Sequence, residues 1–160
     1  MLGDNISIEI IDFFINMPIF DRINAEEIKV VARHMNTIEL GPDEILFRES
    51  DKGNYVFFIR EGELDVLKKS EASGANVILA TLGKGQSIGE MSIIDDFPRS
   101  ATIRAISHTV LYILSKSAFD LILSKHPKIG IKLLKGISCL LSSNLRDTSK
   151  RLADYIPPLT

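Results

Sequence analysis

The sequence predicts a mainly β fold, an antiparallel jelly-roll barrel of the cupin-like, double-stranded β-helix type, with helices before it and a long helix after it. Between residues 36 and 114, short apolar runs alternate with glycine-bearing turns, which is typical of a sandwich or barrel. On both sides of that region, apolar residues recur at helical spacing. We therefore divide the single domain into a helical lead-in (1–35), a barrel (36–114) and C-terminal helices (115–156).

The lead-in reads as two helices. Ile10 and Phe14 recur at helical spacing, and Pro18 is expected to end or kink that first segment. Asn24 precedes two glutamates, which is the arrangement of an N-cap followed by an acidic first turn. The second helix is therefore expected to begin directly after Asn24.

The barrel region contains several short runs that predict strands. They cover residues 55–60, 64–67, 77–82, 102–106 and 110–114. Residues 56–59 are apolar on both faces, which fits an inner strand better than an edge strand. Residues 89–95 are too apolar for a simple hairpin loop, so we expect a short helix inserted between two strands.

Helical spacing returns after the barrel. Ser115 can cap a helix that ends at His126-Pro127. A longer helix is expected from about Pro127 into the 150s, where Pro157-Pro158 stop it. Leucines at heptad-like spacing mark one stripe of this helix: Leu134, Leu141, Leu145 and Leu152.

Composition fits one ordinary globular domain. The 160 residues are 45% hydrophobic and 25% charged, and the net charge of −2 gives no electrostatic footprint for nucleic acid. The one cysteine, Cys139, reads as a small apolar helix residue and fits a reducing compartment. Because no basic, apolar leader begins the chain and charges interrupt every apolar run, we expect a cytoplasmic protein with no membrane span.

Residues 87–102, which read SIGEMSIIDDFPRSAT, hold the candidate site. A glycine such as Gly89 lets a backbone approach closely, and Glu90 can accept hydrogen bonds from hydroxyl groups. Arg99 offers a planar fork that matches phosphate oxygens. Such a segment can hold a small anion that also carries hydroxyl groups.

This segment resembles the phosphate-binding cassette of the cyclic-nucleotide-binding domain family, which includes catabolite activator-type regulators, kinase regulatory subunits and nucleotide-gated channels. The family pattern is roughly G-E-x-A-L, a short bend, and P-R-x-A-T. The matching residues are Gly89, Glu90, Pro98, Arg99, Ala101 and Thr102. Ser92 stands where alanine is usual and Ile93 where leucine is usual. The resemblance extends from about residue 11 to residue 145.

The resemblance implies a regulatory sensor of a cyclic nucleotide, with no catalytic residue and no metal. Arg99 would neutralise the cyclic phosphate, together with backbone amides near Ser100 and Ala101 and at the start of the Glu90 helix. Glu90 would accept from the ribose 2′-hydroxyl, and Gly89 would admit the sugar. The candidate ligand-binding residues are therefore Gly89, Glu90, Met91, Ser92, Arg99, Ser100 and Ala101.

The base preference is less clearly marked. In the family, threonine after the arginine suits guanine and alanine is common for adenine, but this chain has Ser100 there. Adenine contacts often come from the long C-terminal helix, where the available polar residues are Ser138, Ser142, Ser143 and Thr148. We favour cyclic AMP, and cyclic GMP stays open.

The resemblance also suggests how the domain signals. In catabolite activator-type regulators, a helix-turn-helix follows the long helix, whereas this sequence ends at Thr160 without a basic patch, so direct DNA binding is not expected. We expect a homodimer along Leu134, Leu141 and Leu145, or else a stripe that folds back on the barrel. Signalling would then pass through the C-terminal helix to an effector in trans that is not identified, or within a longer native chain.

Three other interpretations account for parts of the sequence. An enzyme on a cupin-like barrel would gather histidines around a metal, but His34, His108 and His126 are far apart and form no H-x-H pair, so we expect no enzyme. Glu90 and Arg99 could simply pair with each other. Finally, a protein-interaction module of the same fold, whose pocket no longer binds nucleotide, remains the alternative function.

Overall fold

The computed structural model describes residue 2 and residues 6–156, and a small helical layer comes first in the chain. It consists of α1 (Ile8–Ile15), a single 3-10 turn η1 (Pro18–Phe20) and α2 (Ala25–Ala32). The predicted cap of α2 is confirmed, because the Asn24 side chain accepts from the Glu27 amide at 2.9 Å while the Glu27 carboxylate accepts from the Asn24 amide at 3.1 Å. Pro18 begins η1, so α1 ends before the proline.

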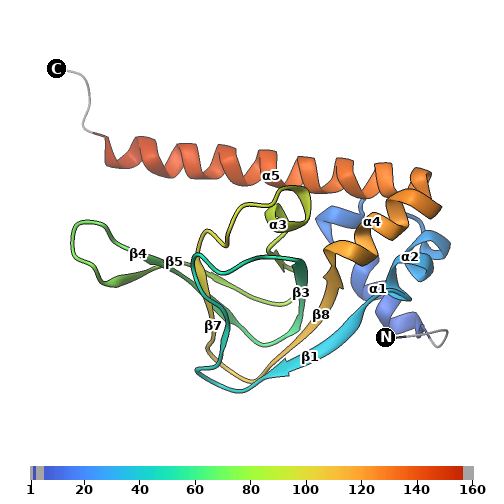
Figure 1. Ribbon diagram of the computed structural model, residues 1–160, viewed down its shortest axis with the longest axis horizontal. Coiled ribbons are helices and arrows are strands. Elements are labelled where there is room, and N and C mark those ends of the chain that lie inside the picture. The colour runs from blue at the N-terminus through green and yellow to red at the C-terminus, as the bar shows by residue number, and fades with distance from the viewer. Residues whose placement is uncertain (1, 3–5, 157–160) are drawn as a thin grey trace.

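The barrel is built from two antiparallel sheets of four strands each, with the orders β1-β8-β3-β6 and β2-β7-β4-β5 (Figure 1). The strands are β1 (Asn36–Leu40), β2 (Ile45–Phe47), β3 (Tyr55–Glu61), β4 (Leu64–Lys69), β5 (Asn76–Leu82), β6 (Ser87–Ile88), β7 (Thr102–Ala105) and β8 (Thr109–Ser115). The predicted jelly-roll class is confirmed, as are the five strands expected from apolar runs.

Strand β3 separates two hydrophobic cores. Because side chains alternate across a strand, Phe57 and Ile59 enter the core between the sheets, while Val56 and Phe58 enter the core beneath the helices. Its partner β8 alternates in step, with Tyr112 opposite Phe58. The apolar character of both faces therefore follows from an inner position, as the sequence predicted.

The remaining helices also match the prediction. A short helix α3 (Met91–Ile94) is inserted between β6 and β7. Ser115 caps α4 (Lys116–Lys125) by accepting from the Ala118 amide at 3.1 Å. The long helix α5 (Pro127–Tyr155) follows, and the predicted stop at Pro157-Pro158 lies outside the described residues.

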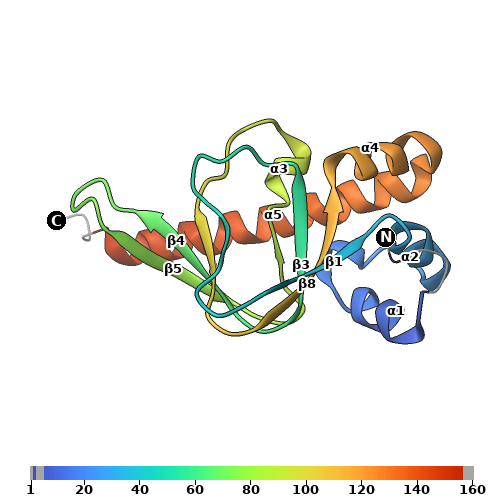
Figure 2. The same cartoon turned by 60° about the horizontal axis from the view of Figure 1, so that its bottom comes forward.

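Helix α5 has one packed half and one exposed half. It lies along the length of the molecule, from the N-terminal helices, past α3, to the end at which the β4–β5 hairpin projects (Figures 1 and 2). In the packed half, Gly136 lies against η1 so closely that a Cβ there would overlap the Ile19 carbonyl oxygen. Residues 142–156 are all exposed.

The predicted leucine stripe is split between these two halves. Leu134 and Leu141 are partly buried against the core beneath the helices of their own chain. Leu145 and Leu152 are 68% and 60% exposed. Leu134 and Leu141 therefore pack back on their own domain, as the second of the two predictions expected. Of the four leucines in the stripe, Leu145 and Leu152 leave an exposed apolar surface.

Candidate functional site

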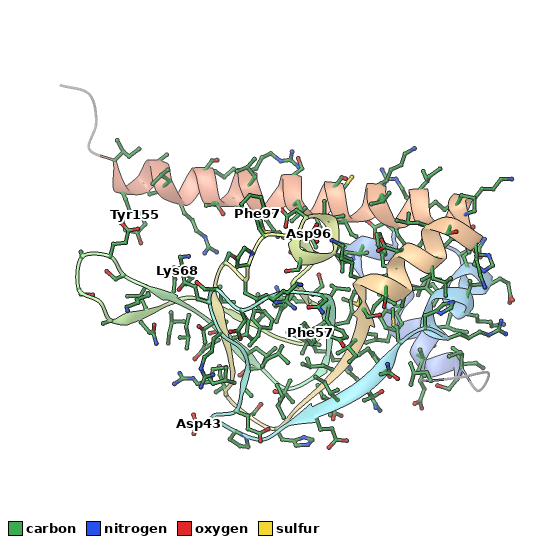
Figure 3. The ribbon with its side chains drawn as sticks, viewed as in Figure 1. Asp43, Phe57, Lys68, Asp96, Phe97 and Tyr155 are labelled. Carbon is green, nitrogen blue, oxygen red and sulfur yellow. The ribbon has the colours of Figure 1, made fainter. Side chains whose placement is uncertain are left out.

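A cavity of about 640 Å³ lies between the second sheet, residues 85–101 and α5. This volume is within the range of roughly 300–1,000 Å³ that is usual for small-molecule sites. Its sheet side is apolar, with side chains from β2, β4, β5 and β7: Phe47, Val66, Leu82 and Ile103. Phe97 also lines the cavity but is 75% exposed, so it lies where the cavity opens to solvent beneath α5 (Figure 3).

The structure brings all seven residues predicted from the 87–102 segment to this cavity. Strand β6 ends at Ile88 and helix α3 begins at Met91, so residues 89–92 lead from the edge of the sheet into the helix. Arg99, Ser100 and Ala101 directly precede β7. The residues on the cavity wall are Gly89, Glu90, Met91, Ser92, Arg99, Ser100 and Ala101.

Arg99 is held inside the wall and is only 5% exposed. Its Nη1 donates to Ser92 Oγ and its Nη2 donates to the Tyr55 carbonyl oxygen, each at 3.0 Å. The guanidinium carbon lies 4.0 Å from the centroid of the Phe47 ring, a cation–π contact. Nε is buried and has no hydrogen-bond partner among the described residues. Burial lowers the pKa of Arg99, and the nearby carboxylates of Asp51 and Glu90 oppose that shift.

Two glycines make room for this guanidinium. Gly89 has φ +82°, and a Cβ there would overlap Arg99 Nη1 and lie 2.9 Å from the Tyr55 carbonyl oxygen. A Cβ at Gly53 would overlap Ser92 Oγ and lie 2.8 Å from Arg99 Nε. Sequence reasoning expected Gly89 to admit a sugar. In the structure, its missing side chain makes space for the arginine.

Glu90 presents an unpartnered acceptor. The side chain is buried, 8% exposed, and Oε2 has no hydrogen-bond partner in the described part of the chain. Burial raises the pKa of Glu90, although its own backbone amide and the charge of Arg99 act in the opposite direction. No ion pair joins Glu90 to Arg99 among the described residues, so the two groups do not satisfy each other. A hydroxyl-bearing ligand would supply the missing donor.

Replacing Glu90 by glutamine is expected to raise the melting temperature of the free protein at neutral pH. The pKa of Glu90 is raised in the folded protein, so folding favours the protonated carboxyl. The stability of the fold therefore falls as the pH rises from the ordinary pKa of a glutamate through the raised pKa of Glu90. Glutamine cannot ionise, so the Glu90→Gln variant does not lose this stability at neutral pH. Thermal melts between about pH 4 and pH 8 measure it, with the exposed Glu61→Gln as control. The gain should disappear near pH 4, and its absence at pH 8 would contradict the prediction.

Helix α5 supplies the wall that faces the barrel. Its cavity-lining residues follow helical spacing and are Leu140, Asn144, Asp147, Thr148 and Arg151. Sequence reasoning missed all but one of these, although polar residues three or four apart on the face of Leu140 were a readable signal.

Of the four polar residues expected on α5, only Thr148 lines the cavity. The Ser138 hydroxyl donates to the Leu134 carbonyl oxygen at 2.8 Å, and the Ser142 hydroxyl accepts from Arg146 at 2.8 Å. Ser143 is exposed on the same helix. Periodicity alone did not show which face of α5 turns toward the barrel.

The described residues hold neither a cluster of metal-ligand side chains nor a helix that could cross a membrane. Among residues 2 and 6–156, no three histidine, cysteine, aspartate or glutamate side chains gather as a metal site would require. No helix in that part of the chain combines the length and the apolar character that crossing a membrane needs. Cys139 is exposed on α5.

Fold and site together define a class of protein. A jelly-roll barrel holds a cavity between a short inserted helix, an arginine-bearing turn and a long C-terminal helix. These are the features of a regulatory domain that senses a small ligand. The family model described as "Cyclic nucleotide-binding domain" matches residues 37–126, more than half of the sequence. The chain belongs to the cyclic nucleotide-binding domain family.

Individual relatives agree with this assignment. A cyclic nucleotide-binding domain from Methylobacillus flagellatus KT superposes with a TM-score of 0.84 at 32% identity, covering 95% of this chain and 85% of that chain. The cAMP-dependent protein kinase regulatory subunit of Mycosarcoma maydis is 27% identical over 61% of this chain. Lysophospholipase nte1 of Neurospora crassa is 29% identical over 71% of it. The matched regions are 18% and 7% of these two relatives, so the chain spans a small part of their length.

Proposed function

We propose that this domain binds a 3′,5′-cyclic nucleotide in the cavity and acts as a sensor without catalysis. The observation that carries the proposal is the pair of buried, unsatisfied atoms in two cavity-lining residues, Arg99 Nε and Glu90 Oε2. An unpaired buried donor and an unpaired buried acceptor each destabilise the protein by about 1–3 kcal/mol. A ligand with an anionic oxygen and a hydroxyl group would satisfy both.

Arg99 supplies the charge that a cyclic phosphodiester needs. A phosphate that leaves water binds only where a charge or hydrogen-bond donors compensate it. The guanidinium is fixed by Ser92 Oγ, the Tyr55 carbonyl and the Phe47 ring, so little side-chain entropy is lost when a ligand binds. We infer that Nε and the neighbouring amides of Ser100 and Ala101 meet the phosphate.

We further propose that Glu90 accepts from the ribose 2′-hydroxyl and that α5 contacts the base. Cyclic AMP is the first candidate, since the Mycosarcoma maydis relative is named as cAMP-dependent and Thr148 offers a hydroxyl at the cavity. Cyclic GMP is the second, since Asp147 offers a carboxylate for guanine donors. Both are needed in every titration.

Titration calorimetry and thermal shift with cyclic AMP and cyclic GMP test the proposal. Ligand at 100 times its dissociation constant adds about 2.7 kcal/mol of stability, which raises the melting temperature by several degrees. The 2′-deoxy form of the tighter ligand tests Glu90. The wild type should lose affinity on removal of the hydroxyl, whereas Glu90→Ala should bind both forms equally. No shift with either nucleotide at millimolar concentration would overturn the proposal.

One observation favours the alternative of an interaction module that binds no nucleotide. Both Nη atoms of Arg99 already have protein partners, so the guanidinium contributes to internal packing even without a ligand. Such a module would keep the same fold and give no response in either titration. The two functions are therefore separated by the same experiment.

We also propose that the output passes through α5 in a homodimer, to an effector that the sequence does not identify. The exposed Leu145 and Leu152 lie on the half of α5 that also lines the cavity, so ligand binding and self-association share one helix. A ligand shifts the helix position only by binding one state more tightly than the other. Light scattering with and without nucleotide tests this, and a monomer at high micromolar concentration under both conditions would contradict the dimer.

A further inference from the structure

Residues outside the cavity hold the arginine-bearing turn, residues 98–102, from behind. Lys68 Nζ on β4 donates to the Ser100 carbonyl oxygen at 2.7 Å and to Glu49 Oε1 at 2.5 Å. The Glu49 amide in turn donates to Thr102 Oγ1 at 2.9 Å. Lys68 lies where the β4–β5 hairpin leaves the barrel (Figure 3) and is not part of the cavity wall. One lysine therefore joins β4 to the turn without reaching the ligand space.

The bond to Ser100 fixes the orientation of a peptide unit. The described residues contain no cis peptide bond, and in a planar trans peptide the N–H points away from the preceding carbonyl. When the Ser100 carbonyl points to Lys68, the Ala101 N–H points to the opposite side. Ala101 is buried, 9% exposed, and lines the cavity.

The peptide before it is held in the same way. The Arg99 carbonyl oxygen accepts from the Ser50 amide at 2.8 Å, and the Arg99 amide donates to the Asp51 carbonyl at 2.8 Å. Among the described residues, neither the Ser100 amide nor the Ala101 amide donates a hydrogen bond. Two adjacent N–H groups are thus left available at the cavity wall.

We propose that Lys68 is a positioning residue that holds the Ser100–Ala101 peptide so that the Ala101 N–H faces the anion of the ligand. This inference rests on the proposed nucleotide site, and Lys68 itself does not touch the ligand. Lys68 would act by orienting the peptide through its hydrogen bond and not by attracting the anion, because the opposite charges of Lys68 and Glu49 cancel at long range. The side chains are 42% and 27% exposed, so solvent screens that pair further.

Hydrogen bonds favour the ionised form of Glu49, the partner of Lys68. The side-chain hydrogen bond from Lys68 and the backbone hydrogen bond from Lys69 lower the pKa of Glu49. The carboxylate therefore remains ionised below its ordinary range and keeps the lysine in place. The positioning contact is expected to survive mild acidification.

Three variants of the full chain test the inference. Lys68→Met removes the donor, Lys68→Arg keeps one, and Lys69→Met removes the neighbouring charge from the exposed end of β4. Titration with cyclic AMP and cyclic GMP at low and high salt should show about three- to tenfold weaker binding for Lys68→Met, the loss typical of one hydrogen bond. Lys68→Arg should restore most of the affinity, and Lys69→Met should stay within about twofold of the wild type.

The salt series separates positioning from simple attraction. A lost hydrogen bond weakens binding by a similar factor at both salt concentrations, whereas a lost long-range attraction weakens it only at low salt. If the weaker nucleotide binding of Lys68→Met returned to the wild-type affinity at high salt, the inference would be overturned. Equal losses in Lys68→Met and Lys69→Met, or no recovery in Lys68→Arg, would overturn it as well.

A second readout needs no ligand. In ¹H–¹⁵N spectra of the free protein, the Ala101 and Ser100 amide resonances should shift in Lys68→Met and stay in place in Lys69→Met. If the wild type binds neither nucleotide, the proposed function fails, and these two resonances alone decide the positioning role. Unchanged Ala101 and Ser100 resonances in Lys68→Met would overturn it in either case.

Discussion

The Arg99→Ala variant is expected to bind its cyclic nucleotide at least tenfold, and up to more than a hundredfold, more weakly than the wild type. Each hydrogen bond to a charged group contributes about 1.5–3 kcal/mol, and a phosphate left without a cation in this buried wall loses more. Titration calorimetry measures the change directly. The free protein should also melt earlier, because Ser92 Oγ and the Tyr55 carbonyl lose their donor.

Two comparisons make the Arg99 result specific. Arg99→Lys keeps a charge but cannot donate to Ser92 and Tyr55 in the same planar geometry, so it should recover only part of the affinity. Arg60→Ala removes an exposed arginine that does not line the cavity and should bind like the wild type. If Arg99→Ala bound as tightly as Arg60→Ala, the proposed phosphate site would be wrong.

The Gly136→Ala variant is expected to destabilise the fold by about 2–3 kcal/mol, the upper part of the range for an overpacked core. In most helices this substitution is stabilising, because alanine has the higher helix propensity. Here a Cβ would overlap the Ile19 carbonyl oxygen and lie 2.8 Å from its carbonyl carbon, both of which are backbone atoms that a rotamer change cannot move. Helix α5 would have to separate from η1.

Thermal and urea denaturation measure this effect. For a domain of this length, a loss of 2–3 kcal/mol lowers the melting temperature by about 4–12 °C. Ser143→Ala, at an exposed position of the same helix, should leave stability unchanged or slightly raised. A Gly136→Ala protein that melts at or above the wild-type temperature would show that the contact between α5 and η1 is loose.

The sequence predicted those elements whose signals are local. Asn24 and Ser115 are capping residues within three residues of the amides they bind, so each helix start could be read directly. The alternation in β3 likewise needs only neighbouring residues. Strands β1, β2 and β6 were not singled out. Strand β1 has only two apolar residues and none that is fully buried, β6 has two residues, and the pairing of β2 with β7 shifts register between Ile45 and Phe47.

The candidate site was predictable where side chains carry the chemistry. The seven ligand-binding residues expected between Gly89 and Ala101 all line the cavity, whereas of the four polar residues expected on α5 only Thr148 does. Their roles toward a ligand stay predictions. The Tyr55 carbonyl, 44 residues away from Arg99, could not be read, because a backbone oxygen has no sequence signature. The role of Gly53 could not be read either. It leaves room for Ser92 and Arg99, and only the packed structure shows that this room is needed.

The two halves of α5 depend on different sources of order. The first half is fixed by tertiary contacts of Ile129, Leu133 and Ile137, whereas the side chains of residues 142–156 are all exposed. An isolated helix shorter than about 12–15 residues is marginal in water. The distal turns are therefore expected to fray more readily than the packed half. A molecule that contacts them, whether a bound nucleotide or a second chain, would then stabilise the helix itself as well as the contact.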